Sequence, residues 1–303
     1  MLRKLITLSL LSALPFMANA DDATTQNTQA TIQATRIVSA SNPITQIISA
    51  LNAEDRLVGI DRTSHTKPSL QNIPDIGYRT MLSSEGILSL KPDLILLAHD
   101  SGPINVLEQL QHSQVTVMQL PELKELSDIQ QAVTTISASL NRAEEGALLN
   151  QKITEESAQL EAMTAQNPPM TGFFIMQEAQ AGSPQVSGDK TSADKLLELL
   201  NINNAFDEDF DHYRAVSLES QLQKRADIVL IGKRASFDHN MTTPQAELAP
   251  FTRRTEGLAD WPAALQPKCV FDVNMSNYLV FGIHIYAEST QLLDAIQHCM
   301  AEQ

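Results

Sequence analysis

The sequence predicts two α/β lobes joined by a single long helix, with a ligand cleft between the lobes. Three observations favour this fold class. Short apolar runs alternate with helical patterns over most of the chain, the stretch 141–166 has helical spacing and no proline, and the segment 81–97 recurs 134 positions later at 215–231. Alternation of this kind is typical of parallel strands covered by helices.

The alternating elements form two groups, one on each side of the long helical stretch. In the first group the expected strands are 37–38, 57–60, 94–97 and 115–118, and the expected helices are 44–51, a short one beginning at 84, and 104–112. In the second group the expected strands are 173–176, 228–231 and 270–273, and the expected helices are 192–200 and a terminal one beginning near 287. Each group is large enough to form a lobe with a core of its own.

The stretch between the groups predicts the linking helix. Apolar side chains recur at Leu149, Ile153 and Leu160, which is the spacing of one helical face. At 1.5 Å per residue such a helix would be about 37 Å long. Pro168 and Pro169 end it, because proline cannot continue a helix.

The repeat between 81–97 and 215–231 indicates that the two lobes are related. The segments align without gaps and are identical at five of seventeen positions. Both copies also occupy the same place within their group. We therefore expect two Rossmann-like lobes related by a pseudo-two-fold axis, with the cleft between them.

Each copy of the repeat carries a serine and then a glutamate two residues later. Ser83 and Ser217 can cap a short helix, and Glu85 and Glu219 then fall in its first turn, where the helix dipole favours a negative charge. This local role would explain the pattern. The alternative is that the two carboxylates form a matched pair for a symmetric basic partner.

The N-terminus has the order of a cleavable secretion signal. Arg3 and Lys4 precede an apolar run over 5–17, and Ala18-Asn19-Ala20 follows as the expected cleavage site. The run is too short to span a bilayer, and no cysteine follows the site to carry a lipid. We expect a soluble, secreted protein. The expected parts are a signal peptide 1–20, a mobile leader 21–35, an N-terminal lobe 36–140, the linking helix 141–167 and a C-terminal lobe 168–303.

The charge argues against one class of partner. The chain carries a formal charge of −15, and loss of Arg3 and Lys4 with the signal would make it −17. Nucleic-acid phosphates require a basic surface, so nucleic acid is not an expected ligand.

The two cysteines, Cys269 and Cys299, leave two interpretations open. In an oxidising compartment they could pair, closing a loop of about 30 residues at a gain of about 3 kcal/mol. Otherwise they are two buried free thiols on a late strand and the last helix.

Motifs for catalysis are absent from the sequence. It contains no Gly-x-Ser-x-Gly, no glycine-rich phosphate loop, no His-Glu-x-x-His and no Cys-x-x-Cys. The histidines are dispersed, which also disfavours a bare metal-ion site. We expect a binding protein with no catalytic cofactor rather than an enzyme.

Several segments resemble the periplasmic binding proteins of ABC importers for heme, vitamin B12 and ferric siderophores, and the hemin-binding branch most of all. Pro74-x-x-Gly77-Tyr78 before Leu82-Ser-x-Glu-Gly86 is the most specific of them, whereas Lys91-Pro92-Asp93 before a strand is common to the wider superfamily. The others are 36–38, 57–61, 188 with 191–194, 213 with 216–217, 257–259 and 281–282. The resemblance covers nearly all of the chain after residue 36 and implies two lobes joined by a rigid helix.

The resemblance implies that Tyr78 ligates the iron of a bound heme. A phenolate is a hard anionic oxygen suited to Fe(III), and tyrosine is a known axial ligand of heme. Many relatives have an arginine two residues past this tyrosine, where the chain has Thr80, so Arg79 and Arg214 are the nearest basic candidates for the tyrosinate or a heme propionate.

The sequence offers several candidates for a second axial ligand or a further heme contact. They are His65, His212, His239, Met241 and His284. Coordination by tyrosine alone is the alternative.

The resemblance also implies partners. Glu85 and Glu219 match the family's docking glutamates, which contact arginines of the permease dimer in the inner membrane. The expected ligand is heme, transported through the periplasm and supplied by an outer-membrane heme receptor system. A cobalamin or a ferric siderophore is the alternative ligand of the same importer class.

Overall fold

The computed structural model describes residues 34–177, 184–233, 249–255 and 267–302. These residues belong to one compact unit. The predicted signal peptide, most of the predicted leader, His239, Met241 and the 257–259 segment lie outside the described residues. The last two leader residues belong to the folded part, because Ala34 is fully buried and Thr35 donates two hydrogen bonds to Asp93.

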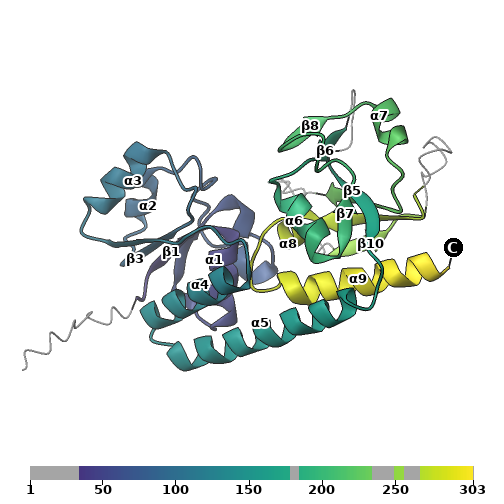
Figure 1. Cartoon of the computed structure of the whole chain (residues 1–303). Helices are drawn as coiled ribbons and strands as arrows, with labels where there is room; N and C mark the ends of the chain where they lie inside the picture. Colours follow the sequence, from purple (N-terminus) through teal and green to yellow (C-terminus); the bar gives the residue numbers. More distant parts are fainter. Residues whose placement is uncertain (1–33, 178–183, 234–248, 256–266, 303) are drawn as a thin grey trace, which may run out of the picture. The chain divides into compact units, whose positions relative to one another are not determined.

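The first lobe is built on a four-stranded parallel sheet with the order β2-β1-β3-β4. Its strands are β1 (Ile37–Ala40), β2 (Leu57–Ile60), β3 (Leu94–Leu97) and β4 (Thr116–Gln119), and its helices are α1 (Asn42–Ala50), α2 (Ser84–Ser89), α3 (Ile104–Gln111) and α4 (Leu126–Ser139). Three short 3-10 turns, at 54–56, 62–64 and 68–70, complete it. Figure 1 shows α2 and α3 on one face of the sheet.

The second lobe has a mixed sheet with the order β10-β11-β9-β5-β6-β8, and β7 pairs with β5. Its strands are β5 (Met170–Gln177), β6 (Gln185–Ser187), β7 (Ile202–Asn204), β8 (Tyr213–Ala215), β9 (Ile228–Lys233), β10 (Phe251–Arg253) and β11 (Cys269–Asn274). Its helices are α6 (Ser192–Leu199), α7 (Leu218–Gln223), α8 (Met275–Tyr278) and α9 (Ile285–Ala301). The central strands β11, β9, β5 and β7 are parallel, so the predicted α/β fold class is confirmed.

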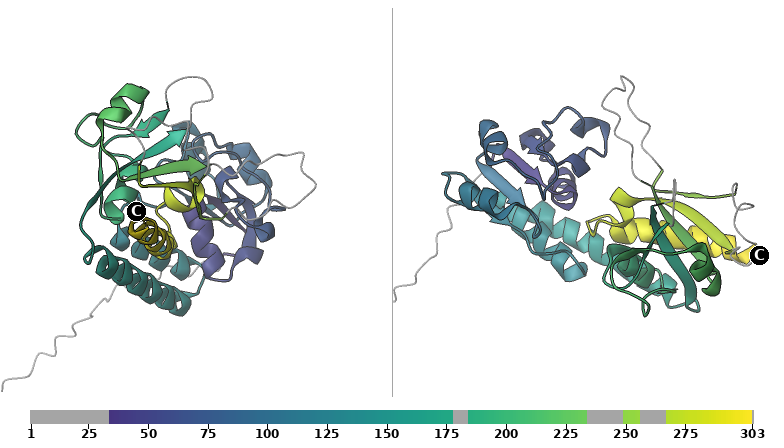
Figure 2. Two further views of the ribbon diagram at one scale, coloured as in Figure 1. Left: turned by 90° about the vertical axis from the view of Figure 1, so that its right-hand side faces the viewer. Right: turned by 90° about the horizontal axis from the view of Figure 1, so that it is seen from above.

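The linking helix is α5 (Ala143–Thr164), about 33 Å long at 1.5 Å per residue. It begins two residues later than the predicted start because Asn141 ends the preceding helix α4. Asn141 has φ +56°, a left-handed conformation that asparagine adopts readily after a helix. Figure 2 shows from two sides that α9 runs alongside α5.

Helix α4 was not predicted, although the sequence carries its signals. Glu125 and Asp128 form a reciprocal capping box at its N-terminus. Ile129, Val133 and Ile136 are fully buried at helical spacing.

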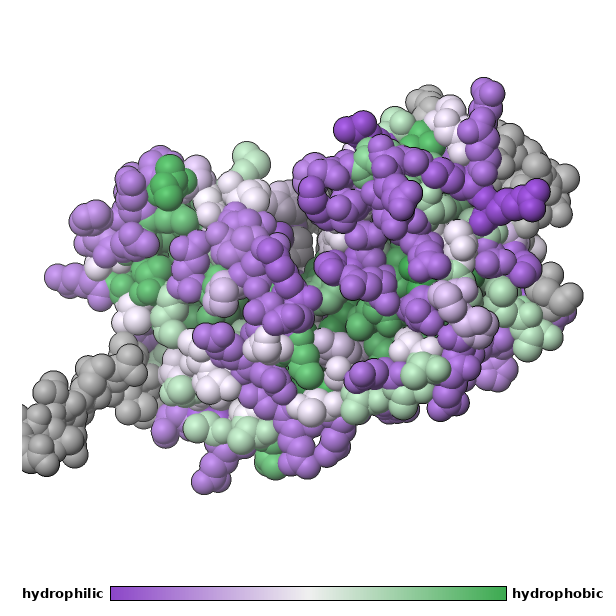
Figure 3. Space-filling model, in the orientation of Figure 1, coloured by the Kyte–Doolittle hydropathy of each residue, from purple (hydrophilic) through white to green (hydrophobic). Residues whose placement is uncertain are grey.

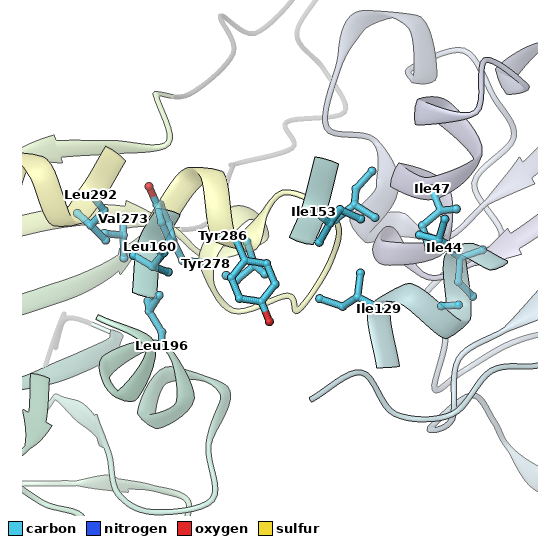
Figure 4. Packing of buried hydrophobic residues seen from close by; sticks show 14 of the residues in the cluster. Ile44, Ile47, Ile129, Ile153, Leu160, Leu196, Val273, Tyr278, Tyr286 and Leu292 are labelled. Atoms are coloured by element: carbon cyan, nitrogen blue, oxygen red, sulfur yellow. The ribbon is translucent and has the colours of Figure 1, made fainter. Parts of the chain in front are cut away.

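One hydrophobic cluster extends through both lobes. Alternate residues of β3 and β9 point into it, including Leu96 and Leu230, while their neighbours point to the outer faces. Helix α5 contributes Ile153 and Leu160, and Figure 4 shows Ile153 beside Ile129 of the first lobe and Leu160 beside Leu196 of the second. The two lobes therefore share a core along α5.

The repeat recognised in the sequence has the same local structure in both lobes. Helices α2 and α7 are both six residues long and start 134 positions apart, and strands β3 and β9 start with the same offset.

The C-terminal helix is fixed covalently as well. Cys269 at the start of β11 and Cys299 in α9 form a disulfide, with their Cα atoms 6.1 Å apart.

Within the described ranges, no helix is long and apolar enough to cross a membrane.

Truncation of the buried face of α5 should test the shared core. We expect Ile153→Ala and Leu160→Ala each to lower the free energy of unfolding by about 2–5 kcal/mol, because each leaves a cavity. Leu148→Ala is the matched control on the same helix, since Leu148 is 68% exposed, and should change it by less than about 0.5 kcal/mol. Urea unfolding followed by circular dichroism should show one transition. Two separate transitions in the wild type would contradict the shared core.

Candidate functional site

A cavity of about 750 Å³ lies where loops of both lobes meet. Residues at the carboxyl ends of parallel strands line it, as expected for ligand sites of α/β sheets. They are 41–44 after β1, 62–63 after β2, 98–100 after β3, 120–123 after β4, 176 at the end of β5, and 275–276 after β11. The space-filling view shows the surface hollowed between the lobe of α3 and the lobe of α7 (Figure 3).

Tyr78 lines this cavity from the first lobe and is 49% exposed. Two hydrogen bonds at Gly77 hold the loop that carries Tyr78. The Gly77 N–H donates to Asp75 Oδ1 at 2.7 Å, and the Gly77 carbonyl accepts from Arg62 N at 2.9 Å. Gly77 has φ +86°, a conformation that favours glycine, so the Gly-Tyr pair of the sequence motif sets the direction of the tyrosine.

Arg62 is the cation that lies against Tyr78. Its guanidinium carbon is 5.1 Å from the centre of the tyrosine ring, and its Nε lies 3.0 Å from Asp75 Oδ2. Partial burial acts to raise the pKa of Asp75, but the Gly77 N–H and the ion pair with Arg62 outweigh it and lower that pKa. The sequence motifs did not single out Arg62, which is the second residue after the predicted strand 57–60.

Arg79 also lines the cavity and is ion-paired. Its Nε lies 2.7 Å from Asp100 Oδ1, and Asp100 belongs to the loop after β3. The two loops are further joined by backbone bonds, from Gly102 N to the Arg79 carbonyl and from Leu82 N to the Gly102 carbonyl, both 2.8 Å. The tyrosine loop is thus bound to its neighbour at Arg79 and at Leu82.

The second lobe contributes Tyr213 to the lining, but not its neighbours in sequence. Arg214 is exposed and its guanidinium carbon lies 5.4 Å from the centre of the Phe210 ring. His212 is exposed, has φ +64° and accepts a hydrogen bond from Gly188 through its carbonyl. Neither Arg214 nor His212 is among the lining residues.

His65 and His284 do not line the cavity either. His65 is half-buried, and its Nδ1 lies 3.1 Å from the carbonyl oxygen of Leu70. His284 is exposed and stands at the N-terminus of α9. The structure brings together Tyr78 and Arg79 of the predicted site residues, and adds Arg62.

Apolar side chains also line the cavity, beside polar ones that include the carboxylates of Asp100 and Glu122. Leu120, Leu123, Met176, Leu279 and Phe281 line the cavity. An exposed phenol, two guanidinium groups and apolar walls suit a large, mostly apolar ligand that carries anionic groups or a metal centre. Among the described residues, no group of three or more His, Cys, Asp or Glu could hold a metal ion by itself.

The two lobes touch at the floor of the cavity. Asn42, at the start of α1, donates from Nδ2 to the carbonyl oxygen of Ser276 at 3.4 Å, and both residues line the cavity. Gly282 lies so close to Gln46 of α1 that a Cβ at this position would collide with the glutamine side chain. A larger residue here would have to displace the end of the Gln46 side chain where the loop after α8 meets the first lobe.

Glu85 and Glu219 lie in equivalent places on the two lobes. Both are exposed in the first turn of their helices, α2 and α7 (Figure 1). Ser83 and Ser217 cap these helices, each accepting a backbone N–H at 3.2 Å. The capping role predicted for the serines is confirmed, and both carboxylates are exposed.

The chain belongs to the periplasmic binding protein family, whose model matches residues 37–272. Among curated relatives, a vitamin B12-binding protein of Vibrio vulnificus strain YJ016 is 25% identical over 217 residues, which span 71% of this chain and 77% of the relative. Among solved structures, the periplasmic heme-binding protein HutB of Vibrio cholerae is 25% identical with a TM-score of 0.66, covering 88% of this chain and 98% of that one.

Two further solved structures share the fold at lower identity. The periplasmic heme-binding protein RhuT of Roseiflexus sp. RS-1 is 24% identical with a TM-score of 0.71, covering 87% of this chain and 98% of that one. The vitamin B12-binding protein BtuF of Vibrio cholerae is 20% identical with a TM-score of 0.71, covering 88% and 98%. The fold and family are thus shared by binders of two different ligands.

A buried carboxyl group lies behind the cavity floor. Glu288 of α9 accepts a hydrogen bond from Asn277 Nδ2 at 2.7 Å through Oε1, and its Oε2 is buried without a partner. Burial raises the pKa of Glu288 to about 7. Asn277 belongs to α8, whose residues Met275 and Ser276 line the cavity.

The raised pKa of Glu288 predicts a pH-dependent stability. The folded state holds this proton more tightly than the unfolded chain, so the stabilisation is fully present below about pH 4.5 and is lost as the pH rises through about 7. We expect Glu288→Gln to raise the free energy of unfolding at pH 8 by up to about 3 kcal/mol, and to change it little at pH 4.5. Urea unfolding at both pH values would measure this. Equal effects at both would contradict a raised pKa.

Proposed function

We propose that this protein captures ferric heme in the periplasm and delivers it to the permease of an ABC importer. The observation that carries the proposal is Tyr78 with Arg62 at the wall of a large cavity. A phenolate is a suitable ligand for ferric heme iron, and a guanidinium beside it stabilises the negative charge. The signal peptide predicted at 1–20 supports a periplasmic location in this proposal.

The walls of the cavity fit the rest of a heme. Apolar side chains such as Leu123, Met176 and Phe281 can cover the porphyrin faces, and each Å² of apolar area removed from water contributes about 25 cal/mol. Arg79 is fixed by Asp100 near the cavity, where its remaining N–H groups can meet a propionate. In this proposal heme is cargo, and an outer-membrane heme receptor system supplies it.

Cobalamin is the second candidate, because the curated relatives in the comparison include several vitamin B12-binding proteins. The two ligands would interact differently with Tyr78. Ferric heme has an axial position open to a phenolate, whereas a cobalamin would use the tyrosine only for packing. Loss of the hydroxyl therefore discriminates between them.

A hemin titration of wild type and Tyr78→Phe tests the ligand. Phenylalanine keeps the ring and removes only the oxygen. We expect wild type to bind hemin saturably with a tyrosinate-type absorption spectrum, and Tyr78→Phe to lose that spectrum and bind at least about tenfold more weakly. Wild type that does not bind hemin would refute the proposal, and an unchanged spectrum in Tyr78→Phe would refute the role of the tyrosine.

The paired glutamates give a separate prediction for delivery. Glu85→Lys with Glu219→Lys should leave hemin binding unchanged, because both side chains are exposed and outside the cavity. Heme transfer to the importer reconstituted in proteoliposomes should be lost, because lysine repels the basic partner. Glu155→Lys with Glu161→Lys on the exposed side of α5 makes the same change in charge and should transfer heme normally. Equal loss in both double variants would show a general charge effect instead of docking.

A further inference from the structure

Two large apolar side chains are exposed near Glu85 in the first lobe. Met81 is 76% exposed and Ile104 is 72% exposed, and neither lines the cavity. The other large apolar or aromatic side chains with high exposure in the described residues are Tyr78, at the cavity, and Leu148, on α5. Single exposed apolar residues are common on protein surfaces, so it is the pairing of Met81 with Ile104 that calls for an explanation.

Backbone hydrogen bonds hold the segments of Met81 and Ile104 together. The N–H of Leu82, the residue after Met81, donates to the Gly102 carbonyl at 2.8 Å. The Gly102 N–H donates to the Arg79 carbonyl, also at 2.8 Å. Ile104 follows two residues after Gly102 and is the first residue of α3. The two exposed side chains therefore belong to neighbouring segments that are bonded to each other.

Glu85 lies close to these segments. It is exposed in the first turn of α2, four residues after Met81. Helices α2 and α3 are neighbours (Figure 1), and the Ser84 hydroxyl donates to Gln109 Oε1 between them. Met81, Ile104 and Glu85 thus form one surface, here called the first-lobe patch, in which two apolar side chains accompany a carboxylate.

The second lobe differs at the position that corresponds to Met81. In the repeat this position is Ala215, and Arg214 precedes it. Both residues are exposed. Glu85 and Glu219 therefore have different surroundings, with a large apolar side chain before the first helix and a small one next to a cation before the second.

We propose that the first-lobe patch is the apolar part of the contact with the permease, where Met81 and Ile104 pack around a basic side chain that pairs with Glu85. This inference rests on the proposed function, because it concerns the delivery step. Lysine and arginine have an apolar stem and a charged end, so a carboxylate flanked by apolar side chains matches them. The apolar part of such a contact carries no charge, so salt does not screen it.

A second copy of this chain would fit the patch poorly. Each copy carries a formal charge of −15 and would bring its own Glu85 to the contact, so the two copies would repel each other. A partner with exposed basic side chains meets no such repulsion. The patch also lies outside the cavity lining, so substitutions in it should leave heme capture intact.

Biolayer interferometry of the hemin-loaded protein on the permease of its importer, held in lipid nanodiscs, tests the patch. We expect Met81→Ser with Ile104→Ser to bind the permease at least about tenfold more weakly than wild type, with hemin affinity unchanged. Leu148→Ser is the matched control, because it removes a similarly exposed apolar side chain from α5, and it should bind the permease as wild type does.

The salt dependence separates the apolar contact from the charged one. Between about 0.1 and about 1 M salt, the affinity ratio of wild type to Met81→Ser with Ile104→Ser should stay constant, because these substitutions change no charge. The effect of Glu85→Lys should shrink over the same range, because salt screens it. A ratio that falls with salt in the serine variant would contradict an apolar contact.

The outcomes distinguish this inference from the function on which it rests. If Glu85→Lys with Glu219→Lys abolishes permease binding while Met81→Ser with Ile104→Ser leaves it unchanged, the inference is overturned and docking through the glutamates stands. An equal loss in Leu148→Ser would also overturn it, as would a wild-type dimer that the serine variant dissociates. If wild type does not bind the permease, the delivery step of the proposed function is overturned and this inference with it.

Discussion

Burial of apolar side chains along α5 is the interaction on which the rest of the structure depends. Ile153 and Leu160 lie seven residues apart on one face of this helix and reach the cores of different lobes. A single cluster therefore holds both sheets, and the disulfide between Cys269 and Cys299 fixes α9 alongside. Because the lobes share this core, the loops at the carboxyl ends of their strands meet in one place, and the cavity forms there.

The residues around the cavity are of two kinds. The fully buried strand residues stabilise the fold, together with Gly282 where the lobes touch. Those at the wall of the cavity remain partly exposed, as Tyr78 does. The ion pairs Arg62–Asp75 and Arg79–Asp100 each anchor a loop at the wall of the cavity.

Local patterns were sufficient to predict the fold class, the strands β3 and β9, the helix α5 to within three residues at each end, and the repeat. Helix α4 was missed although its capping box and its buried isoleucines are visible in the sequence. The residues of the candidate site were harder to predict. Arg62 meets Tyr78 only because Gly77 turns the loop back, and the Arg79–Asp100 pair joins two loops 21 residues apart. Contacts of this kind depend on loop conformation, which hydrophobic periodicity does not encode. Arg214 and His212 were therefore predicted as site residues along with Arg79, but they do not line the cavity.

The choice between heme and cobalamin is the central claim, because fold and family are shared by binders of both. Isothermal titration of one preparation of the mature protein with hemin and, separately, with cyanocobalamin tests it most directly. We predict saturable binding of hemin and no saturable heat with cyanocobalamin at the same concentrations. Saturable binding of cyanocobalamin without binding of hemin would contradict heme as the ligand and assign the cavity to cobalamin.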